Sequence, residues 1–232
     1  PASPSFARRS SRRWAAWHER LEPIGPLMRL VLASRNDHKL RELGRTLTTV
    51  ELEPLPAEVE LPPETGTTFA ENALIKARAA HEATGSSAIA DDSGIEVAAL
   101  DGAPGVRSAR FAGEDATDEQ NLSLLLERTA AAGDRRAAYV CALAYVDAGG
   151  GERLFEARCE GELTSAPRGE RGFGYDPAFV PRDTGPGDAR TMAELDDYEK
   201  DAISHRGRAA RLLEEHLRAH AGLGVAAPEA SP

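Results

Sequence analysis

The sequence predicts an α/β protein with a mixed central sheet. In the first half, short apolar runs typical of buried strands alternate with segments that carry helix-capping signals, which favours parallel strand neighbours. In the second half, two long segments flank the glycine turn Gly149-Gly150-Gly151, which favours an antiparallel hairpin. A chain that combines both patterns is expected to build a mixed sheet rather than a purely parallel one.

The composition is that of an ordinary globular protein. Of 232 residues, 41% are hydrophobic and 28% are charged, which rules out wholesale disorder. The formal net charge is −10, and an acidic surface argues against nucleic-acid or anionic-membrane partners. Apolar runs such as 137–146 are much shorter than the ~20 residues of a membrane-spanning helix. A polyanionic substrate would therefore need a local basic pocket or a metal ion.

The two ends of the chain differ from its middle. Up to Arg13 there are four arginines and no acidic residue. Residues 1–27 are typical of an organelle transit peptide or of an extension, disordered or non-native. We favour the extension because Met28 directly precedes the first convincing strand. We expect one domain over 28–221 and a flexible tail over 222–232, which is rich in Gly, Ala and Pro.

The first half of the domain is expected to alternate between strands and helices. The helix before the third strand has the clearest boundaries, because Thr68 with Glu71 forms a capping box at its start and Gly85 ends it. The predicted order is strand 29–33, helix 37–47, strand 50–55 and helix 69–84.

The second half adds further strands, a glycine-rich loop and two more helices. Thr117 and Gln120 form a second capping box. The predicted order is strand 87–90, the acidic tetrapeptide Asp91-Asp92-Ser93-Gly94, strand 95–100, loop 102–113 with arginines at 107 and 110, a helix after Thr117, hairpin strands 136–147 and 152–164, loop 167–177 and a last helix from about 204 to 220.

The hairpin also predicts a place for the two cysteines. Pairing Tyr145 with Phe155 sets Cys141 opposite Cys159 on one face of the sheet. We expect both to be reduced, buried small hydrophobic residues of a cytoplasmic protein, because two cysteines make neither a zinc site nor a disulfide scaffold.

The first candidate for chemistry is the turn from Ser34 to Lys39. A turn that enters a helix presents free backbone N–H groups and the positive end of the helix dipole. Ser34 and Asn36 add donors and Lys39 adds a full charge, so the turn is a candidate phosphate cradle. The alternative is ordinary capping of a helix by Ser34 and Asn36.

The second candidate is the pair Asp91 and Asp92 at the end of an apolar strand. Adjacent strand residues point to opposite faces, so only one is expected to reach a given pocket. Such a carboxylate suits Mg²⁺, and the alternative is an Asx turn. Glu64 has no structural role that we can assign and fits a metal ligand better than Glu71. Lys76 is either a surface lysine or directed at phosphate.

The third candidate is Gly172-Phe173-Gly174-Tyr175-Asp176-Pro177. Aromatic residues between glycines suit a loop that stacks on a flat ring, although a plain glycine turn would have the same composition. Lys200 and the segment Ser204-His205-Arg206 supply donors that could contact a base or phosphates. The alternative is the solvated end of a charged helix.

Together these pieces resemble the inosine/xanthosine triphosphate pyrophosphatases. The similar stretches occur in the family's order and cover most of residues 28–217, namely LVLASRNDHKLREL, ETGTTFAENALIKA, AIADDSGIEVAALDGAPGVRSARFAGEDATD, GFGYDPAF and EKDAISHRGRA. The resemblance implies an elongated fold with two lobes around a substrate cleft. It also implies a homodimer and Mg²⁺-dependent release of pyrophosphate from ITP, dITP and XTP.

The resemblance also implies roles for individual residues. The triphosphate would be held by Ser34, Arg35, Asn36, Asp37, His38, Lys39 and Lys76. Glu64 and Asp92 would hold the metal, and Asp92 would also accept the proton. The remaining substrate contacts would come from Ser93, Phe173, Gly174, Tyr175, Asp176, Lys200, His205 and Arg206. Many relatives carry Gly where Arg35 stands, so Arg35 either strengthens phosphate binding or points to solvent.

Two other functions remain open at this point. One is a pyrophosphatase of the same fold that acts on modified pyrimidine nucleotides. The other is a nucleotide sensor that binds without turnover, against which the acids Glu64, Asp91 and Asp92 argue.

Overall fold

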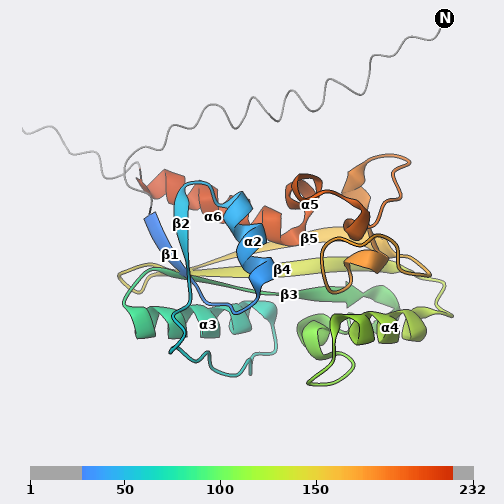
Figure 1. Ribbon diagram of the computed structural model, residues 1–232, viewed down its shortest axis with the longest axis horizontal. Helices are drawn as coiled ribbons and strands as arrows, with labels where there is room; N and C mark the ends of the chain where they lie inside the picture. Colours follow the sequence, from blue (N-terminus) through green and yellow to red (C-terminus); the bar gives the residue numbers. More distant parts are fainter. Residues whose placement is uncertain (1–27, 222–232) are drawn as a thin grey trace, which may run out of the picture.

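The computed structural model describes residues 28–221, with helices on both sides of one central sheet (Figure 1). The expected N-terminal extension, 1–27, and the expected tail, 222–232, lie outside the described residues. Among the helices of residues 28–221, none is long and apolar enough to cross a lipid bilayer.

The sheet has six strands in the order β2-β1-β3-β4-β5-β6. Strand β1 pairs in parallel with β2 and β3, and the pairs from β3 to β6 are antiparallel. The prediction of a mixed sheet is therefore confirmed. The strands are β1 (Met28–Leu32), β2 (Val50–Pro54), β3 (Ala88–Val97), β4 (Arg136–Val146), β5 (Glu152–Leu163) and β6 (Phe179–Pro181).

Helices cover both faces of the sheet. Figure 1 shows α3 and α4 along one face and α2, α6 and α5 along the other. The α-helices are α2 (Asp37–Thr46), α3 (Phe69–Thr84), α4 (Asp118–Thr129), α5 (Asp197–Ile203) and α6 (His205–Ala221). Short 3-10 helices are η1 (Ala98–Leu100), η2 (Gly105–Arg110), η3 (Asp176–Ala178), η4 (Arg182–Thr184) and η5 (Met192–Glu194).

The side-chain alternation of β1 shows how the two faces are filled. Leu30 and Leu32 point into a core with Leu43 of α2 and Leu213 of α6. Val31 and Ala33 point into the other core, where α3 contributes buried alanines such as Ala77. Because successive strand residues face opposite sides, this short strand anchors both helical layers.

Local signals placed α3 correctly at both ends. Thr68 accepts a hydrogen bond from the Glu71 backbone N–H, and the Glu71 side chain returns to the Thr68 N–H. Gly85 ends the helix with a φ of 66°, in the left-handed region that favours glycine. The predicted range 69–84 is therefore confirmed.

The acidic tetrapeptide lies inside one continuous strand, and not between two shorter ones as predicted. Strand β3 pairs with β4 from Ala88 to Val97, so the backbone stays extended through Asp91 and Asp92. The expected strand beyond Val97 is replaced by η1. The two acids nonetheless lie beyond the last pairing of β1, which reaches only to Ile89 of β3.

The hairpin register differs from the prediction by two residues. Cys141 lies opposite Ala157, and Cys159 lies opposite Tyr139. The carboxylate of Asp147 accepts the backbone N–H groups of Gly149 and Gly151, each at 2.8 Å, which closes a turn centred on Gly149. A shift of two residues keeps each side chain on its predicted face, so both cysteines are buried as expected. Burial raises the pKa of each thiol to about 12.

Helix α5 and strand β6 were not predicted. Helix α5 is short, and Asp196 caps it by accepting the backbone N–H of Glu199 at 2.8 Å. Ser204 follows the end of α5 and caps α6, because its hydroxyl accepts the Gly207 N–H at 3.1 Å. Strand β6 has only three residues and pairs with the end of β5. Elements this short lack the periodicity on which a sequence-based prediction depends.

Candidate active site

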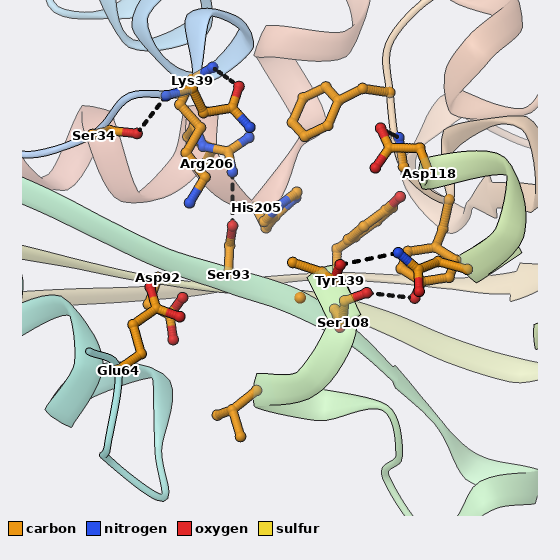
Figure 2. A pocket seen from close by; sticks show the side chains of 18 of the residues that line it. Ser34, Lys39, Glu64, Asp92, Ser93, Ser108, Asp118, Tyr139, His205 and Arg206 are labelled. Atoms are coloured by element: carbon orange, nitrogen blue, oxygen red, sulfur yellow. Dashed lines mark hydrogen bonds between the residues drawn. The ribbon is translucent and has the colours of Figure 1, made fainter. Parts of the chain in front are cut away.

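A pocket of about 340 Å³ opens where β1 ends beside β3. Its size is in the range of small-molecule sites. The walls come from the turn before α2, the loop before α3, the middle of β3, η2, the Phe173–Asp176 segment and the start of α6. Figure 2 shows Glu64 and Asp92 at one end, and Tyr139 and His205 away from them.

The exposed edge of β3 explains why cations gather here. Within residues 28–221, no strand pairs with this edge beyond Ile89, apart from a single bridge between Glu96 and Pro104, so its backbone groups need other partners. The carbonyl of Asp91 accepts from the ammonium groups of Lys76 at 2.9 Å and Lys39 at 3.3 Å. The N–H of Ile95 donates to the Ser108 hydroxyl at 2.9 Å.

Close packing of η2 on β3 forms another wall of the pocket. A Cβ atom on Gly94 would overlap the Ser108 hydroxyl and the Gly105 carbonyl, so only glycine allows this approach. The predicted loop 102–113 is therefore partly helical. The Tyr175 hydroxyl donates to the Ser108 carbonyl at 2.7 Å, which joins the same wall to the Phe173–Asp176 segment.

Asp91 is a fully buried member of an ion network. Its Oδ2 lies 3.1 Å from the Lys39 ammonium and 2.9 Å from the Arg206 Nε. Burial acts to raise the pKa of Asp91, but the charges of Lys39 and Arg206 overcome it and hold the pKa well below its ordinary value. Asp91 therefore stays ionised and holds these two cations in place.

Asp92 points to the other face, toward α3. Its carboxylate accepts from the Asn72 amide at 3.1 Å and lies 3.6 Å from the Lys76 ammonium. Burial raises the pKa of Asp92, and the negative charge of Glu64 raises it further. A carboxylate with a raised pKa at the rim of a pocket is suited to accept a proton.

Glu64 and Lys76 complete this end of the pocket. The Lys76 ammonium donates to Glu64 at 2.6 Å, and its side chain is buried, so the surface-lysine alternative is wrong. Burial opposes ionisation of Glu64, but Lys76 outweighs it and lowers the pKa of Glu64. Glu71 is exposed and engaged with the backbone of Thr67 at 2.6 Å, as its capping role predicts.

The acids at this end fit a hard divalent cation only in part. Within residues 28–221, no group of three or more His, Cys, Asp or Glu side chains is arranged to hold a metal ion. Glu64 and Asp92 supply two carboxylates, and Mg²⁺ commonly completes its coordination with water and substrate phosphates. The donor set therefore fits Mg²⁺ bound together with a polyphosphate.

The turn before α2 both caps the helix and lines the pocket. The side-chain oxygen Oδ1 of Asn36 accepts the backbone N–H groups of His38 at 2.9 Å and Lys39 at 3.3 Å. Ser34, Asn36 and Lys39 line the pocket. Asp37 is exposed and does not line it, and His38 stacks on Phe173 with ring centroids 4.8 Å apart.

Arg35 has a role that the sequence did not predict. Its guanidinium donates to the backbone carbonyls of Leu55 and Pro56, each at 2.7 Å, and of Val59 at 2.8 Å. Arg35 is nonetheless an exposed residue that also lines the pocket. It ties the turn before α2 to the loop that leads to Glu64.

The Phe173–Asp176 segment is held by contacts from several elements. Asp176 is buried, and it accepts from the Lys200 ammonium at 2.6 Å, the Tyr139 hydroxyl at 3.1 Å and the Phe173 N–H at 3.0 Å. The Gly174 N–H donates to Asp118 of α4 at 2.9 Å. These bonds leave the aromatic ring of Phe173 against the pocket, as expected of a stacking surface.

A buried acid, Glu42 of α2, links the two basic residues of this end. It lies 2.7 Å from the Lys200 ammonium and also pairs with the Arg206 guanidinium. Burial opposes its ionisation, but Arg206 and Lys200 lower its pKa to about 2. Arg206 also donates to the Ser93 hydroxyl at 2.7 Å (Figure 2). Most of the donors of Arg206 are thus already engaged.

His205 is the least satisfied polar group at this end. Its ring stacks on Tyr139 with centroids 4.6 Å apart and an interplanar angle of 5°. Burial, and the nearby Arg206 charge, lower its pKa well below the ordinary value, so the ring is neutral. Among residues 28–221, its buried Nδ1 finds no hydrogen-bond partner.

Comparison with known proteins identifies the family. A sequence model of the Ham1 family matches residues 30–216. The chain belongs to the Ham1 family. The predicted family resemblance is therefore confirmed.

Relatives of this Ham1 chain carry names that describe an activity. A Cutibacterium acnes protein named dITP/XTP pyrophosphatase is 52% identical over 84% of this chain and 98% of its own length. A Frankia alni protein with the same name is 53% identical over 82% of this chain and 98% of its own.

Solved Ham1 structures share the fold. A HAM1 protein from Coxiella burnetii matches with a TM-score of 0.73 and 44% identity, covering 83% of this chain and 100% of its own. The Staphylococcus aureus Ham1 protein matches with a TM-score of 0.74 and 37% identity, covering 83% and 99%.

Several residues of this Ham1 pocket were missed by reasoning from the sequence. Asn72 lies one helical turn before Lys76, so the spacing could have placed both on one face. Glu42 likewise follows Lys39 by three positions on α2. Asp118 and Tyr139 act through the Phe173–Asp176 segment, and nothing local to their own sequence indicates it.

Proposed function

We propose that this chain hydrolyses deaminated purine nucleoside triphosphates, namely ITP, dITP and XTP, to the monophosphate and pyrophosphate. The observation that carries the proposal is the division of one pocket into two chemically different ends. One end holds Glu64, Asp92, Lys39 and Lys76, and the other holds an aromatic ring among buried donors. The names of the relatives at about half identity support the same reaction.

The acidic and basic end suits cleavage of a phosphoanhydride. In the proposed reaction, a water attacks the α-phosphorus and Asp92 accepts its proton. The bond between the α-phosphorus and the oxygen bridging to the β-phosphate breaks, and its electron pair leaves with pyrophosphate. The raised pKa of Asp92 brings the base closer to neutral pH, which favours proton transfer. The ammonium groups of Lys39 and Lys76 would neutralise negative charge on the phosphates.

Glu64 and Asp92 are the residues that would hold Mg²⁺, with Asn72 orienting Asp92 by the hydrogen bond of 3.1 Å. When bound, the ion would neutralise phosphate charge and polarise the phosphorus–oxygen bonds under attack. Glu64 would have to leave Lys76, with which it now makes a 2.6 Å ion pair. That exchange would free the Lys76 ammonium for a phosphate oxygen.

The other end suits a 6-oxo purine. Phe173 offers a stacking surface, and Lys200 and Arg206 lie within 5.0 and 5.7 Å of its ring centroid. A base with a carbonyl at position 6 accepts hydrogen bonds where adenine presents an amino donor. A desolvated site built from donors discriminates strongly against the mismatched base, because its own groups would remain unpaired.

A substrate panel tests the proposal. Purified protein with Mg²⁺ at alkaline pH would be assayed for pyrophosphate and phosphate with ITP, XTP, dATP, dGTP and dTTP. Rapid pyrophosphate release from ITP and XTP is expected. A preference for dTTP would favour the pyrimidine pyrophosphatase alternative, and tight binding without turnover would favour the sensor.

We further propose that the enzyme is a cytoplasmic homodimer, as the family resemblance implies. Sedimentation of the purified chain tests the dimer, and fractionation of the source cells tests the location.

A further inference from the structure

Arg110 is a positively charged residue of η2 to which no role has been given above. The position of η2 is fixed on β3 through the Ser108 hydroxyl, which accepts the Ile95 N–H at 2.9 Å. The Arg110 side chain is only 25% exposed, and it follows Ala109, a residue that lines the pocket. Its guanidinium approaches Glu64, with Nη1 at 3.5 Å from Oε2.

The donors of Arg110 are not in use. Among residues 28–221, the Arg110 guanidinium makes no hydrogen bond, and its other neighbour, Glu114, is loosely placed at 3.8 Å and 74% exposed. An arginine carries five N–H donors in a fixed fork that matches phosphate oxygens. A partly buried fork held only by longer ion pairs is free to take a stronger acceptor.

Three elements thus bring a cation to this end of the molecule, close to Asp91, Asp92 or Glu64. Lys39 of α2 and Lys76 of α3 each donate a hydrogen bond to the backbone carbonyl of Asp91. Arg110 approaches Glu64 from η2. Of these three cations, only Arg110 makes no side-chain hydrogen bond within residues 28–221, so its donors are the ones left for a further phosphate.

We propose that Arg110 binds the outer phosphates of the substrate, those that depart as pyrophosphate, by bidentate hydrogen bonds. The proposal rests on the proposed function for the identity of the substrate. The geometry on which it stands is independent of the base, because Arg110 lies at the end of the pocket that holds Glu64. It predicts that a polyphosphate without any nucleoside is bound by the same residue.

The test is the binding of magnesium tripolyphosphate, measured by calorimetry, to the full chain. Arg110→Gln should weaken binding about tenfold, as expected for the loss of a hydrogen bond between charged groups. The affinity of Arg110→Lys should lie between those of the wild type and Arg110→Gln, because lysine keeps the charge but lacks the forked guanidinium. Arg107→Gln is the matched control, since Arg107 is on the same helix, is 65% exposed, and pairs with Glu114 at 3.7 Å.

A double variant separates direct contact from an effect through Glu64. Arg110→Gln should still weaken tripolyphosphate binding in the Glu64→Gln background if the guanidinium touches phosphate. If it has no further effect there, or if Arg110→Gln alone stays within twofold of wild type, the proposal is wrong. If the wild-type protein hydrolyses no nucleoside triphosphate, the proposed function is wrong. If Arg110→Gln nevertheless weakens tripolyphosphate binding, the phosphate-binding role of Arg110 still holds.

Discussion

Asp91 and Asp92 are neighbours in the chain, yet their carboxylates lie on opposite faces of β3 and their pKa values are shifted in opposite directions. Asp91 faces Lys39 and Arg206, and their charges outweigh burial and lower its pKa. Asp92 faces Glu64 and the edge of α3, where burial raises its pKa. One dipeptide thus supplies both an anchor for cations and a candidate base.

The first prediction follows from these opposite shifts. The lowered pKa of Asp91 means that its ionised form stabilises the fold above the ordinary value of 3.8, and that this contribution is lost as pH falls through the lower folded value. Asp91→Asn should therefore lower the free energy of unfolding at pH 7 by about 3–5 kcal/mol, the cost of breaking a buried ion pair. Denaturant unfolding at pH 7 and at pH 3 would show a smaller loss at the lower pH.

Asp92→Asn should have the opposite effect on stability. The folded protein favours protonated Asp92, so that contribution is present below the ordinary value of 3.8 and is lost as pH rises through the raised value. At pH 7 the ionised group opposes folding, and its removal should raise the Tm. Lys76 keeps its 2.6 Å contact with Glu64 in this variant. A lower Tm at pH 7 would show that Asp92 is a stabilising partner instead.

Catalysis gives a separate prediction for Asp92→Asn. Loss of a general base costs ~10²–10⁴-fold, and loss of a metal ligand adds to this, so kcat should fall by at least about 10³-fold. The Asn72 contact can be kept, because the new amide also offers an acceptor. Steady-state pyrophosphate release from ITP provides the measurement, and activity within tenfold of wild type would contradict the assignment.

Glu64 and Glu71 give a matched pair for the metal. Glu64→Gln should raise the Mg²⁺ concentration needed for half-maximal activity by about tenfold or more, as the loss of one of two charged ligands implies. Glu71→Gln should leave it unchanged, because that side chain is exposed and bonded to the backbone of Thr67. Magnesium titrations of both variants supply the comparison. The reverse pattern would make Glu71 the ligand.

Arg35 should act through the loop that it holds. Arg35→Lys removes the fork that spans the carbonyls of Leu55, Pro56 and Val59, so amides of that loop should exchange faster with solvent. The KM for ITP should rise by no more than about fivefold, since exposed contacts contribute up to ~1 kcal/mol. Arg29→Lys is the control, because Arg29 is exposed and pairs with Glu51 at 3.2 Å. An unchanged exchange rate would show that the loop does not depend on Arg35.

The parts of the fold that were predictable are those specified by neighbouring residues. Helix α3 was placed correctly because Thr68, Glu71 and Gly85 fix its ends within one stretch of chain. The hairpin register was missed by two residues because the side chain of Asp147 fixes the turn, and a run of three glycines does not show which one is central. The short α5 was missed because too few residues carry its pattern.

The site was predictable as a set of residues and not as a set of contacts. Ser34, Lys39, Glu64, Asp92 and Lys200 line one pocket, as the family resemblance led us to expect. Their partners were not predictable, because the decisive contacts join distant positions. Arg206 and Glu42 are 164 positions apart, so no local sequence pattern predicts that ion pair.

The last prediction concerns how the base is selected. Arg206→Ala would leave the buried acids Asp91 and Glu42 without a shared partner, so lost activity could reflect lost stability. His205 offers a cleaner test, since its buried Nδ1 has no partner within residues 28–221. His205→Phe keeps an aromatic ring against Tyr139 and removes the ring nitrogens, although the phenyl ring is slightly larger than imidazole.

In that variant, kcat/KM for ITP should fall about 10- to 100-fold, the range for a buried polar group that loses its partner. The already low kcat/KM for dATP should change little, so the ratio of kcat/KM for ITP to kcat/KM for dATP should fall. The Tm should stay level or rise, because an unsatisfied buried nitrogen is removed. His216→Phe on the same helix is the control, since His216 packs on Phe155 instead of lining the pocket. Equal losses for ITP and dATP would assign base selection to Lys200 and Phe173, the groups left at that end of the pocket.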